Sequence, residues 1–296
     1  MKLLASLKQM EYLVALAETR HFAKASDLCN VTPSTLSAGI QDLERVLGVS
    51  LAERTKRVVL MTSLGIDIAR RARLVLRDAE DIMELAARHR DPMTGDMKLG
   101  VIPTISPFLL PRVLPTMNAA YPELRLYLRE EQTAVLLDRL RAGEIDVGLI
   151  ALPFETDGLE VRVLFEDGFR FACHAGHQLA GRKGVTSRDL AGQPLLLLEE
   201  GHCLRGHALD ACLLDKGQFR SQFEATSLNT VVEMVAAGLG VTLLPQLAID
   251  ANITAGSDIR LVPLSAKASR QIGLVWRPLS PRADDFELLA DAFGRR

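Results

Sequence analysis

The chain has 296 residues, of which 48% are hydrophobic, and its formal net charge is −2 at pH 7. Such a length suits two or three domains, and no apolar run approaches the about 18 residues of a membrane-spanning helix. The segment Met1–Lys8 carries charge where a signal peptide needs a longer apolar core. We therefore expect a cytoplasmic protein whose four cysteines are reduced at rest. The small net charge argues neither for nor against nucleic-acid binding, so the distribution of charge matters more.

The first 47 residues predict three helices with a tight turn between the second and the third. Apolar residues recur at helical spacing over 7–19, and a second, short helix is expected over 21–29. After the break at 30–32, a third helix is expected from Pro33 to about Leu47, because Thr32 can serve as its N-cap and proline suits the first helical position. Two helices joined in this way are typical of a helix-turn-helix, whose second helix enters the major groove.

Two groups of side chains are the candidates for contacts with DNA. Small hydroxyl residues at the start of the third helix could contact bases: Thr32, Ser34, Thr35 and Ser37, although capping is the favoured role for Thr32. The segment 49–62 contains two short apolar runs around a basic stretch, which predicts a β-wing. Its basic side chains would contact phosphates and position the protein without reading sequence: Arg54, Lys56 and Arg57.

These residues follow a pattern that also occurs in a known family. The combination of Phe22-x-x-Ala25, Thr35-Leu36-Ser37, Leu43-Glu44, Gly48-Val49 and Leu60-x-Thr62-x-x-Gly65 resembles the winged-helix domain of LysR-type transcriptional regulators. The resemblance implies a winged helix-turn-helix DNA-binding domain over residues 1–65, with double-stranded promoter DNA as its partner. The chain departs from the peroxide-sensing members at 33–34, where those members more often carry a glutamine.

A long helix is expected after the wing, because residues 66–89 contain neither glycine nor proline. Apolar residues recur there at steps of four and three: Ile68, Ala72, Val75, Ala79, Ile82 and Ala86. Such a heptad seam favours a helix that pairs with its own copy; the alternative is an amphipathic helix packed on its own domain. We favour a linker and dimerisation helix over 66–92, because one short recognition helix gains greatly from dimerisation.

The remainder predicts an α/β regulatory domain over 93–296. Strands are expected at 97–102, 124–130 and 145–151, separated by helices at 107–120 and 134–142, an order that predicts a parallel sheet flanked by helices. Ligands of such folds bind at the carboxyl ends of strands, where Thr104, Ser106 and Thr133 fall. We expect a first subdomain of about 97–167 and 265–296, which includes a returning strand and a final helix, and a second of about 168–264.

The segment Glu199–Arg205 contains a candidate reactive thiol, Cys203. Only the thiolate is nucleophilic, and a neighbouring cation stabilises it, so His202 and Arg205 favour reactivity. Cys212, nine residues further on, could resolve an oxidised Cys203. Nine helical residues span about 13 Å, whereas a disulfide needs Cα atoms within about 7 Å. Oxidation would therefore have to unwind an intervening helix, as in a redox switch.

The cysteines also allow roles other than a redox switch. Free cysteines are mostly small buried hydrophobes, which is the interpretation for Cys29 and Cys173 and the alternative for Cys203. A zinc site is conceivable from His202, Cys203, His207 and Cys212. Its spacing lacks the usual C-x-x-C and H-x₃-H arrangements, so neither a metal nor a cofactor is expected.

The cysteine region resembles the hydrogen peroxide-sensing branch of LysR-type regulators. The resemblance is carried by Gly201–Arg205 with Cys212, and by Val235–Pro245. It implies a two-subdomain regulatory domain like that of periplasmic binding proteins, Cys203 as the peroxidatic and Cys212 as the resolving cysteine. The implied peroxide pocket comprises Thr104, Thr133, His202 and Arg270.

The same resemblance implies an activator of oxidative-stress genes that works with RNA polymerase as a homodimer or homotetramer. A reductant of the glutaredoxin or thioredoxin type would reset it, and it would not be an enzyme. Gly206 departs from the branch, which commonly has an acidic residue at that position. Two alternatives are a LysR-type regulator of a small organic effector with incidental cysteines, and a thiol peroxidase with a DNA-binding appendage.

Overall fold

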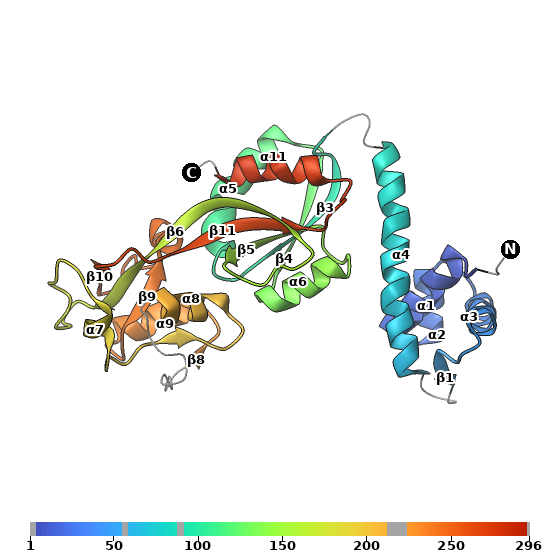
Figure 1. Ribbon diagram of the computed structural model, residues 1–296, viewed down its shortest axis with the longest axis horizontal. Coiled ribbons are helices and arrows are strands. Elements are labelled where there is room, and N and C mark those ends of the chain that lie inside the picture. The colour runs from blue at the N-terminus through green and yellow to red at the C-terminus, as the bar shows by residue number, and fades with distance from the viewer. Residues whose placement is uncertain (1–3, 55–58, 88–91, 212–223, 295–296) are drawn as a thin grey trace. The chain divides into compact units, whose positions relative to one another are not determined.

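The computed structural model describes residues 4–54, 59–87, 92–211 and 224–294. The chain divides into two compact units, Met1–Arg90 and Asp91–Arg296, which Figure 1 shows in ribbon form. Within the described ranges, every helix is too short or too polar to cross a membrane.

The first unit contains the three predicted helices. They are α1 (Leu7–Thr19), α2 (Phe22–Leu28) and α3 (Pro33–Leu47). Thr32 caps α3 through the Thr35 backbone N–H at 3.2 Å, and Gly48 ends it in the left-handed conformation. Leu13, Leu16 and Leu36 are buried between these helices, so the apolar spacing seen in the sequence forms one small core.

The predicted wing is present as an antiparallel pair of β1 (Ala52–Arg54) and β2 (Val59–Met61). The Glu44 carboxylate of α3 accepts hydrogen bonds from the backbone N–H of Leu51 at 2.7 Å and of Ala52 at 3.3 Å. A Cβ on Gly65 would lie 2.0 Å from the carbonyl oxygen of Leu51, so only glycine permits this close approach. Glu44 and Gly65, two residues of the LysR-type pattern, therefore fix the wing to the helix that precedes it and to the helix that follows it.

Helix α4 (Ser63–Ala87) is the long helix expected from the sequence, although it begins before residue 66. Its first half packs on α1, where Ala72 is buried and Arg73 forms an ion pair with Glu18 at 2.7 Å. Further along, Val75 and Ile82 are 41% and 68% exposed. The predicted seam thus divides: its beginning serves the unit's own core, and its continuation presents apolar side chains outward.

The second unit is built on a seven-stranded sheet in the order β10-β6-β11-β5-β3-β4, with β9 also paired to β6. Strands β3 (Gly95–Val101), β4 (Leu124–Glu130) and β5 (Val147–Leu152) are parallel, as predicted. Two long strands, β6 (Glu160–His174) and β11 (Ser269–Trp276), add antiparallel pairs.

Helices cover both faces of the parallel strands. Helix α5 (Ser106–Ala120) and helix α6 (Thr133–Arg141) connect β3 to β4 and β4 to β5. The connection from β3 to β4 and the connection from β4 to β5 run in opposite directions along the sheet. Because such crossovers are right-handed, the two helices lie on opposite faces of the sheet. The final helix α11 (Ala283–Gly294) lies on the α5 side (Figure 1).

Strand β6 exchanges partners along its length. It pairs with β11 up to Gly168, and from Phe169 it pairs with β9 (Thr242–Pro245) and β10 (Ile259–Pro263). The chain beyond this point forms a second lobe with these elements: α7 (Ser187–Leu190), β7 (Leu197–Leu198), α8 (Cys203–Ala211), β8 (Glu224–Ala225), α9 (Leu228–Ala236) and α10 (Gln246–Asp250). Because β7 leads into α8, the first residue of α8 lies near the carboxyl end of a strand.

Candidate functional site

Cys203 is the first residue of α8 and is half-buried. It lines an open pocket of about 410 Å³ between residues 200–210 and the loop at Pro153–Phe154. Cys29 and Cys173 are free thiols that are buried, as predicted, and burial raises the pKa of both. Among the cysteines that the structure describes, Cys203 is therefore the one that a solute can reach.

The turn before Cys203 rests on the start of α6. Gly201 has a φ of +98°, and a Cβ there would lie 2.3 Å from the side-chain oxygen of Gln132. The same Gln132 side chain donates to the Glu199 carboxylate at 3.4 Å. The turn therefore requires glycine both for its backbone conformation and for this close approach.

His202 is buried in this turn, with Nε2 3.7 Å from Glu199 Oε1. Burial lowers the pKa of His202, an effect that the nearby Glu199 carboxylate only partly opposes. The imidazole is therefore neutral at pH 7. The lowered pKa does not favour the sequence interpretation of His202 as a cation beside the thiol. Arg205, the other expected cation, donates from Nη1 to the Leu198 carbonyl at 3.2 Å.

Thr133 is the first residue of α6, next to Gln132. Its side chain is 1% exposed, and its hydroxyl has no hydrogen-bond partner among the described residues. A buried hydroxyl without a partner is unfavourable by about 1–3 kcal/mol. This hydroxyl is thus available to a small polar ligand at the edge of the turn that precedes Cys203.

Arg270 of β11 and Thr104, in the loop after β3, are brought together in the interior. The Arg270 guanidinium donates from Nη1 to the Thr104 hydroxyl at 2.9 Å and from Nη2 to the Thr104 carbonyl at 3.0 Å. Its Nε donates to Asp167 Oδ2 at 3.0 Å, and neither side chain of this ion pair is exposed. Sequence reasoning missed Asp167, since nothing near it in the chain marks it as a partner of Arg270.

The predicted pocket residues form a connected region but do not all line one cavity. His202 lines the open pocket with Cys203, whereas Thr104, Thr133 and Arg270 are not among its lining residues. Contacts between elements link them, because α8 packs on β11 and Gln132 meets the turn at 199–201. The stretch Cys203–Ala211 is helical, and Cys212 lies outside the described residues.

The candidate DNA-binding hydroxyls form a small local network at the start of α3. Thr32 Oγ1 lies 2.8 Å from both Ser34 Oγ and Thr35 Oγ1, and it also caps the helix. Thr32, Ser34 and Thr35 are exposed and Ser37 is half-buried. Capping is thus confirmed for Thr32. The Arg54 side chain, and all of Lys56 and Arg57, lie outside the described residues.

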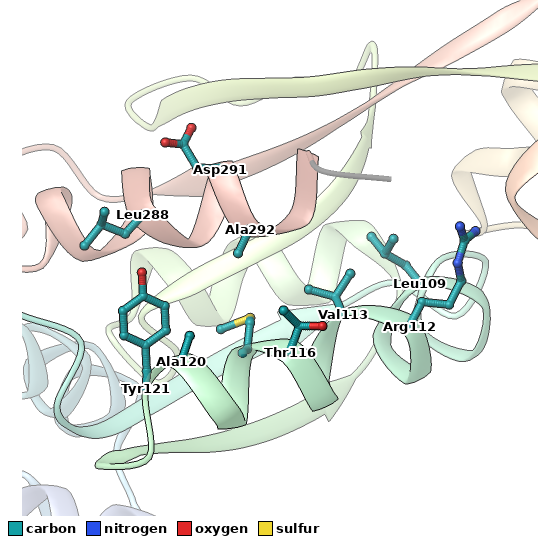
Figure 2. A pocket seen from close by; sticks show the side chains of 10 residues that line it. Leu109, Arg112, Val113, Thr116, Ala120, Tyr121, Leu288, Asp291 and Ala292 are labelled. Atoms are coloured by element: carbon teal, nitrogen blue, oxygen red, sulfur yellow. The ribbon is translucent and has the colours of Figure 1, made fainter.

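A second pocket, of about 270 Å³, lies between α5 and α11 and contains none of the predicted site residues. Figure 2 shows Leu288 of α11 above Tyr121 and Ala120, with Ala292 further along α11 and Val113 and Leu109 towards the other end of the pocket. The sequence offered only the apolar spacing of both helices as a signal for it. Among the described residues, no three histidine, cysteine or acidic side chains gather as metal ligands would.

Comparisons with known proteins match both units. Residues 7–66 match the bacterial regulatory helix-turn-helix protein family of lysR type, and residues 90–296 match the LysR substrate binding domain. Escherichia coli OxyR, a DNA-binding transcriptional dual regulator, is 42% identical over 98% of this chain and 95% of its own length. The HTH-type transcriptional regulator EstR of Acinetobacter baylyi is 41% identical over 100% of this chain and 98% of its own.

Solved structures extend the likeness to the fold. A full-length OxyR variant from Pseudomonas aeruginosa has a TM-score of 0.82 at 36% identity, covering 99% of this chain and 98% of that one. A hydrogen peroxide-bound OxyR mutant from Corynebacterium glutamicum has a TM-score of 0.66 at 35% identity, covering 99% and 94%. The chain therefore belongs to the LysR family of bacterial helix-turn-helix transcription regulators, and it resembles the OxyR members of that family over nearly its whole length.

Proposed function

We propose that this chain is a DNA-binding transcription regulator that senses hydrogen peroxide through oxidation of Cys203. The observation that carries the proposal is the placement of this thiol at the first residue of α8, in an open pocket, while Cys29 and Cys173 are buried. Free backbone N–H groups at a helix N-terminus favour a negative charge nearby, which suits a thiolate. The similarity to OxyR proteins, one of them peroxide-bound, supports the same assignment.

The chemistry is a two-electron oxidation of sulfur. The Cys203 thiolate attacks one peroxide oxygen, an S–O bond forms as the O–O bond breaks, and the departing hydroxide takes up a proton to become water. The resulting sulfenic acid is attacked by the Cys212 thiol, which forms the disulfide and releases water. We assign the hydroxyls of Thr104 and Thr133 and the neutral His202 to hydrogen bonds with peroxide, and Arg270 to the charge of the departing hydroxide.

The helical state of α8 explains how oxidation would become a signal. Cys203–Ala211 is helical, and nine helical residues span about 13 Å, whereas a disulfide needs Cα atoms within about 7 Å. We therefore infer that α8 unwinds when the disulfide forms. Because α8 packs on β11, unwinding changes the packing of the regulatory domain. In a homodimer or homotetramer this change would alter promoter binding and the response of RNA polymerase. A glutaredoxin- or thioredoxin-type reductant would reset the switch, which consumes one peroxide per event and is not a turnover enzyme.

The DNA contacts follow from the winged helix-turn-helix. We assign base contacts to the exposed hydroxyls of Ser34 and Thr35, and phosphate contacts to the basic residues of the wing: Arg54, Lys56 and Arg57. Thr32 contributes by capping the helix that carries these hydroxyls.

The deciding experiment treats the reduced protein with one equivalent of hydrogen peroxide and maps its thiols by mass spectrometry. We expect a disulfide between Cys203 and Cys212 in the wild type. Cys203→Ser should abolish both oxidation and peroxide induction while DNA binding persists, and Cys173→Ala, at a buried thiol, should leave the response intact. Normal peroxide induction in Cys203→Ser would refute the proposal.

A second candidate function is favoured by the pocket between α5 and α11. Its mainly apolar lining suits a small organic effector, and EstR, a regulator not named for peroxide, is as similar to this chain as OxyR is. In that case Cys203 would stay reduced under peroxide. An effector would instead raise the melting temperature, and Val113→Trp, which fills the pocket, would remove that shift.

A further inference from the structure

Asp167 lies at the point where β6 exchanges partners, and it contacts two elements at once. Its Oδ2 accepts from Arg270 Nε at 3.0 Å, and its Oδ1 accepts from the backbone N–H of Leu247 in α10 at 2.8 Å. The carboxylate is fully buried. Burying a charge destabilises the folded state unless the charge is paired and hydrogen-bonded. The Asp167 carboxylate is both, because each of its oxygens accepts a hydrogen bond.

The contacts of Asp167 fix the orientation of the Arg270 guanidinium. A guanidinium is planar and has five N–H donors in a rigid arrangement. Asp167 holds the Nε edge, and Thr104 accepts from the two Nη nitrogens, so three donors are engaged. Of the five donors, the remaining two, one on each Nη nitrogen, stay available to a ligand. Rotation of the plane would move these donors and break the bond to the Thr104 hydroxyl.

We infer that Asp167 is a positioning residue for peroxide reduction: it orients Arg270, and through it Thr104, toward the oxygen that leaves as hydroxide. The inference rests on the proposed function, because it assigns Asp167 a part in that reaction. The bond changes are unaltered, with S–O formation at Cys203, O–O cleavage and protonation of the departing hydroxide. Asp167 touches neither peroxide nor sulfur and acts only through Arg270.

The test compares two electrophiles at the same thiol. Iodoacetamide alkylation of Cys203 reports its accessibility and its thiolate, whereas oxidation by hydrogen peroxide also requires the oriented Arg270 and Thr104. In Asp167→Asn we expect the peroxide rate constant to fall on the order of 10- to 100-fold, as for a misplaced catalytic group. The alkylation rate constant should stay within about twofold of the wild type, since Asp167 does not line the pocket through which Cys203 is reached.

Asp285→Asn is the matched control, because Asp285 is also a buried carboxylate paired with a buried arginine, Arg282, at 3.1 Å. It should lower the melting temperature as well, yet leave the ratio of peroxide to alkylation rates unchanged. Asp167→Asn should slow oxidation far less in the Arg270→Lys variant than in the wild type, since the two residues act as one unit. Should Asp167→Asn fail to fold, Asp167→Glu displaces the carboxylate by one methylene. This variant is expected to show the same slow oxidation by peroxide with an almost unchanged alkylation rate constant.

A peroxide-to-alkylation ratio in Asp167→Asn equal to that of the wild type would overturn the inference and leave Asp167 a purely structural residue. That result is distinct from failure of the proposed function, in which wild-type Cys203 itself stays reduced under peroxide and both proposals fall together.

Discussion

At the scale of single residues, burial determines whether the His202 imidazole carries a charge. A charged imidazole would have stabilised a neighbouring thiolate directly, but burial lowers the pKa of His202 and leaves a neutral ring beside Glu199. A neutral imidazole can donate through one nitrogen and accept through the other. It is thus suited to hold a neutral, hydrogen-bonding molecule such as peroxide, and it contributes no charge to the thiolate.

The lowered pKa of His202 predicts a pH dependence of stability. In the unfolded chain this histidine titrates near 6.5, and in the folded protein it titrates lower. Its contribution to stability is therefore fully present above the unfolded pKa and is lost as pH falls through the folded pKa. Melting temperatures measured between pH 8 and pH 5 should fall less steeply for His202→Gln than for the wild type. Two parallel curves would show that His202 does not titrate differently on folding.

Local sequence patterns predict contacts between residues that are close in the chain, but not contacts between distant residues. Caps and glycines next to a helix act on residues within a few positions, so the role of Thr32 as a cap was predictable. Asp167 and Arg270 are 103 residues apart, and their pairing depends on β6 and β11 lying side by side. The neutral state of His202 likewise depends on burial that only the folded chain provides.

At the scale of elements, the bounds of the helices were predicted to within a few residues, whereas the neighbour that covers each part of the apolar face of α4 was not. The seam of α4 illustrates the difference: Ala72 faces the core of the first unit, whereas Val75, three residues later, is exposed. Heptad spacing fixes which side chains share a face, but not which neighbour covers it. Similarly, the alternation of strands and helices predicted the parallel part of the sheet. Strand β11 rejoins this sheet only after the chain has formed the second lobe, and no local sequence pattern signalled its antiparallel direction.

In the proposed switch, α8 unwinds when the Cys203–Cys212 disulfide forms, and we expect Gly206 to make this unwinding easier. Glycine destabilises a helix interior by about 1 kcal/mol relative to alanine, and a Cβ at Gly206 would meet nothing within 4 Å. Gly206→Ala should therefore stabilise α8 and slow conversion of the Cys203 sulfenic acid to the disulfide about fivefold. The rate of sulfenic acid formation should not change. Rapid-quench mass spectrometry separates the two steps.

Gly181→Ala is the control for this substitution, because Gly181 also has open space around its Cβ position and lies outside the named helices. It should leave both steps at wild-type rates. Equal disulfide rates in Gly206→Ala and the wild type would mean that opening of α8 does not limit closure of the bridge.

At the scale of the whole molecule, the exposed apolar side chains of α4 predict self-association. Ile82 and Met83 are 68% and 72% exposed. Val75 lies two turns before Ile82 in the same predicted seam of α4 and is also exposed. Burying such side chains against a second copy stabilises association by about 1.5–3 kcal/mol for each fully buried side chain, and dimerisation lets two recognition helices bind two half-sites. Ile82→Asp should therefore weaken the dimer and, with it, binding to a promoter that contains two half-sites.

The measurement is analytical ultracentrifugation across a range of concentrations, paired with binding to one and to two half-sites. Ile82→Asp is expected to raise the dimer dissociation constant at least tenfold, because a charge cannot be buried unpaired without a large desolvation penalty. Affinity for a single half-site should remain, since Ile82 lies on α4 and not on the recognition helix α3. Leu74→Asp, at a side chain that is 38% exposed next to the predicted seam, is the control for adding a charge to this helix. A dimer equally stable in Ile82→Asp would place the interface elsewhere and leave α4 only a connector between the two units.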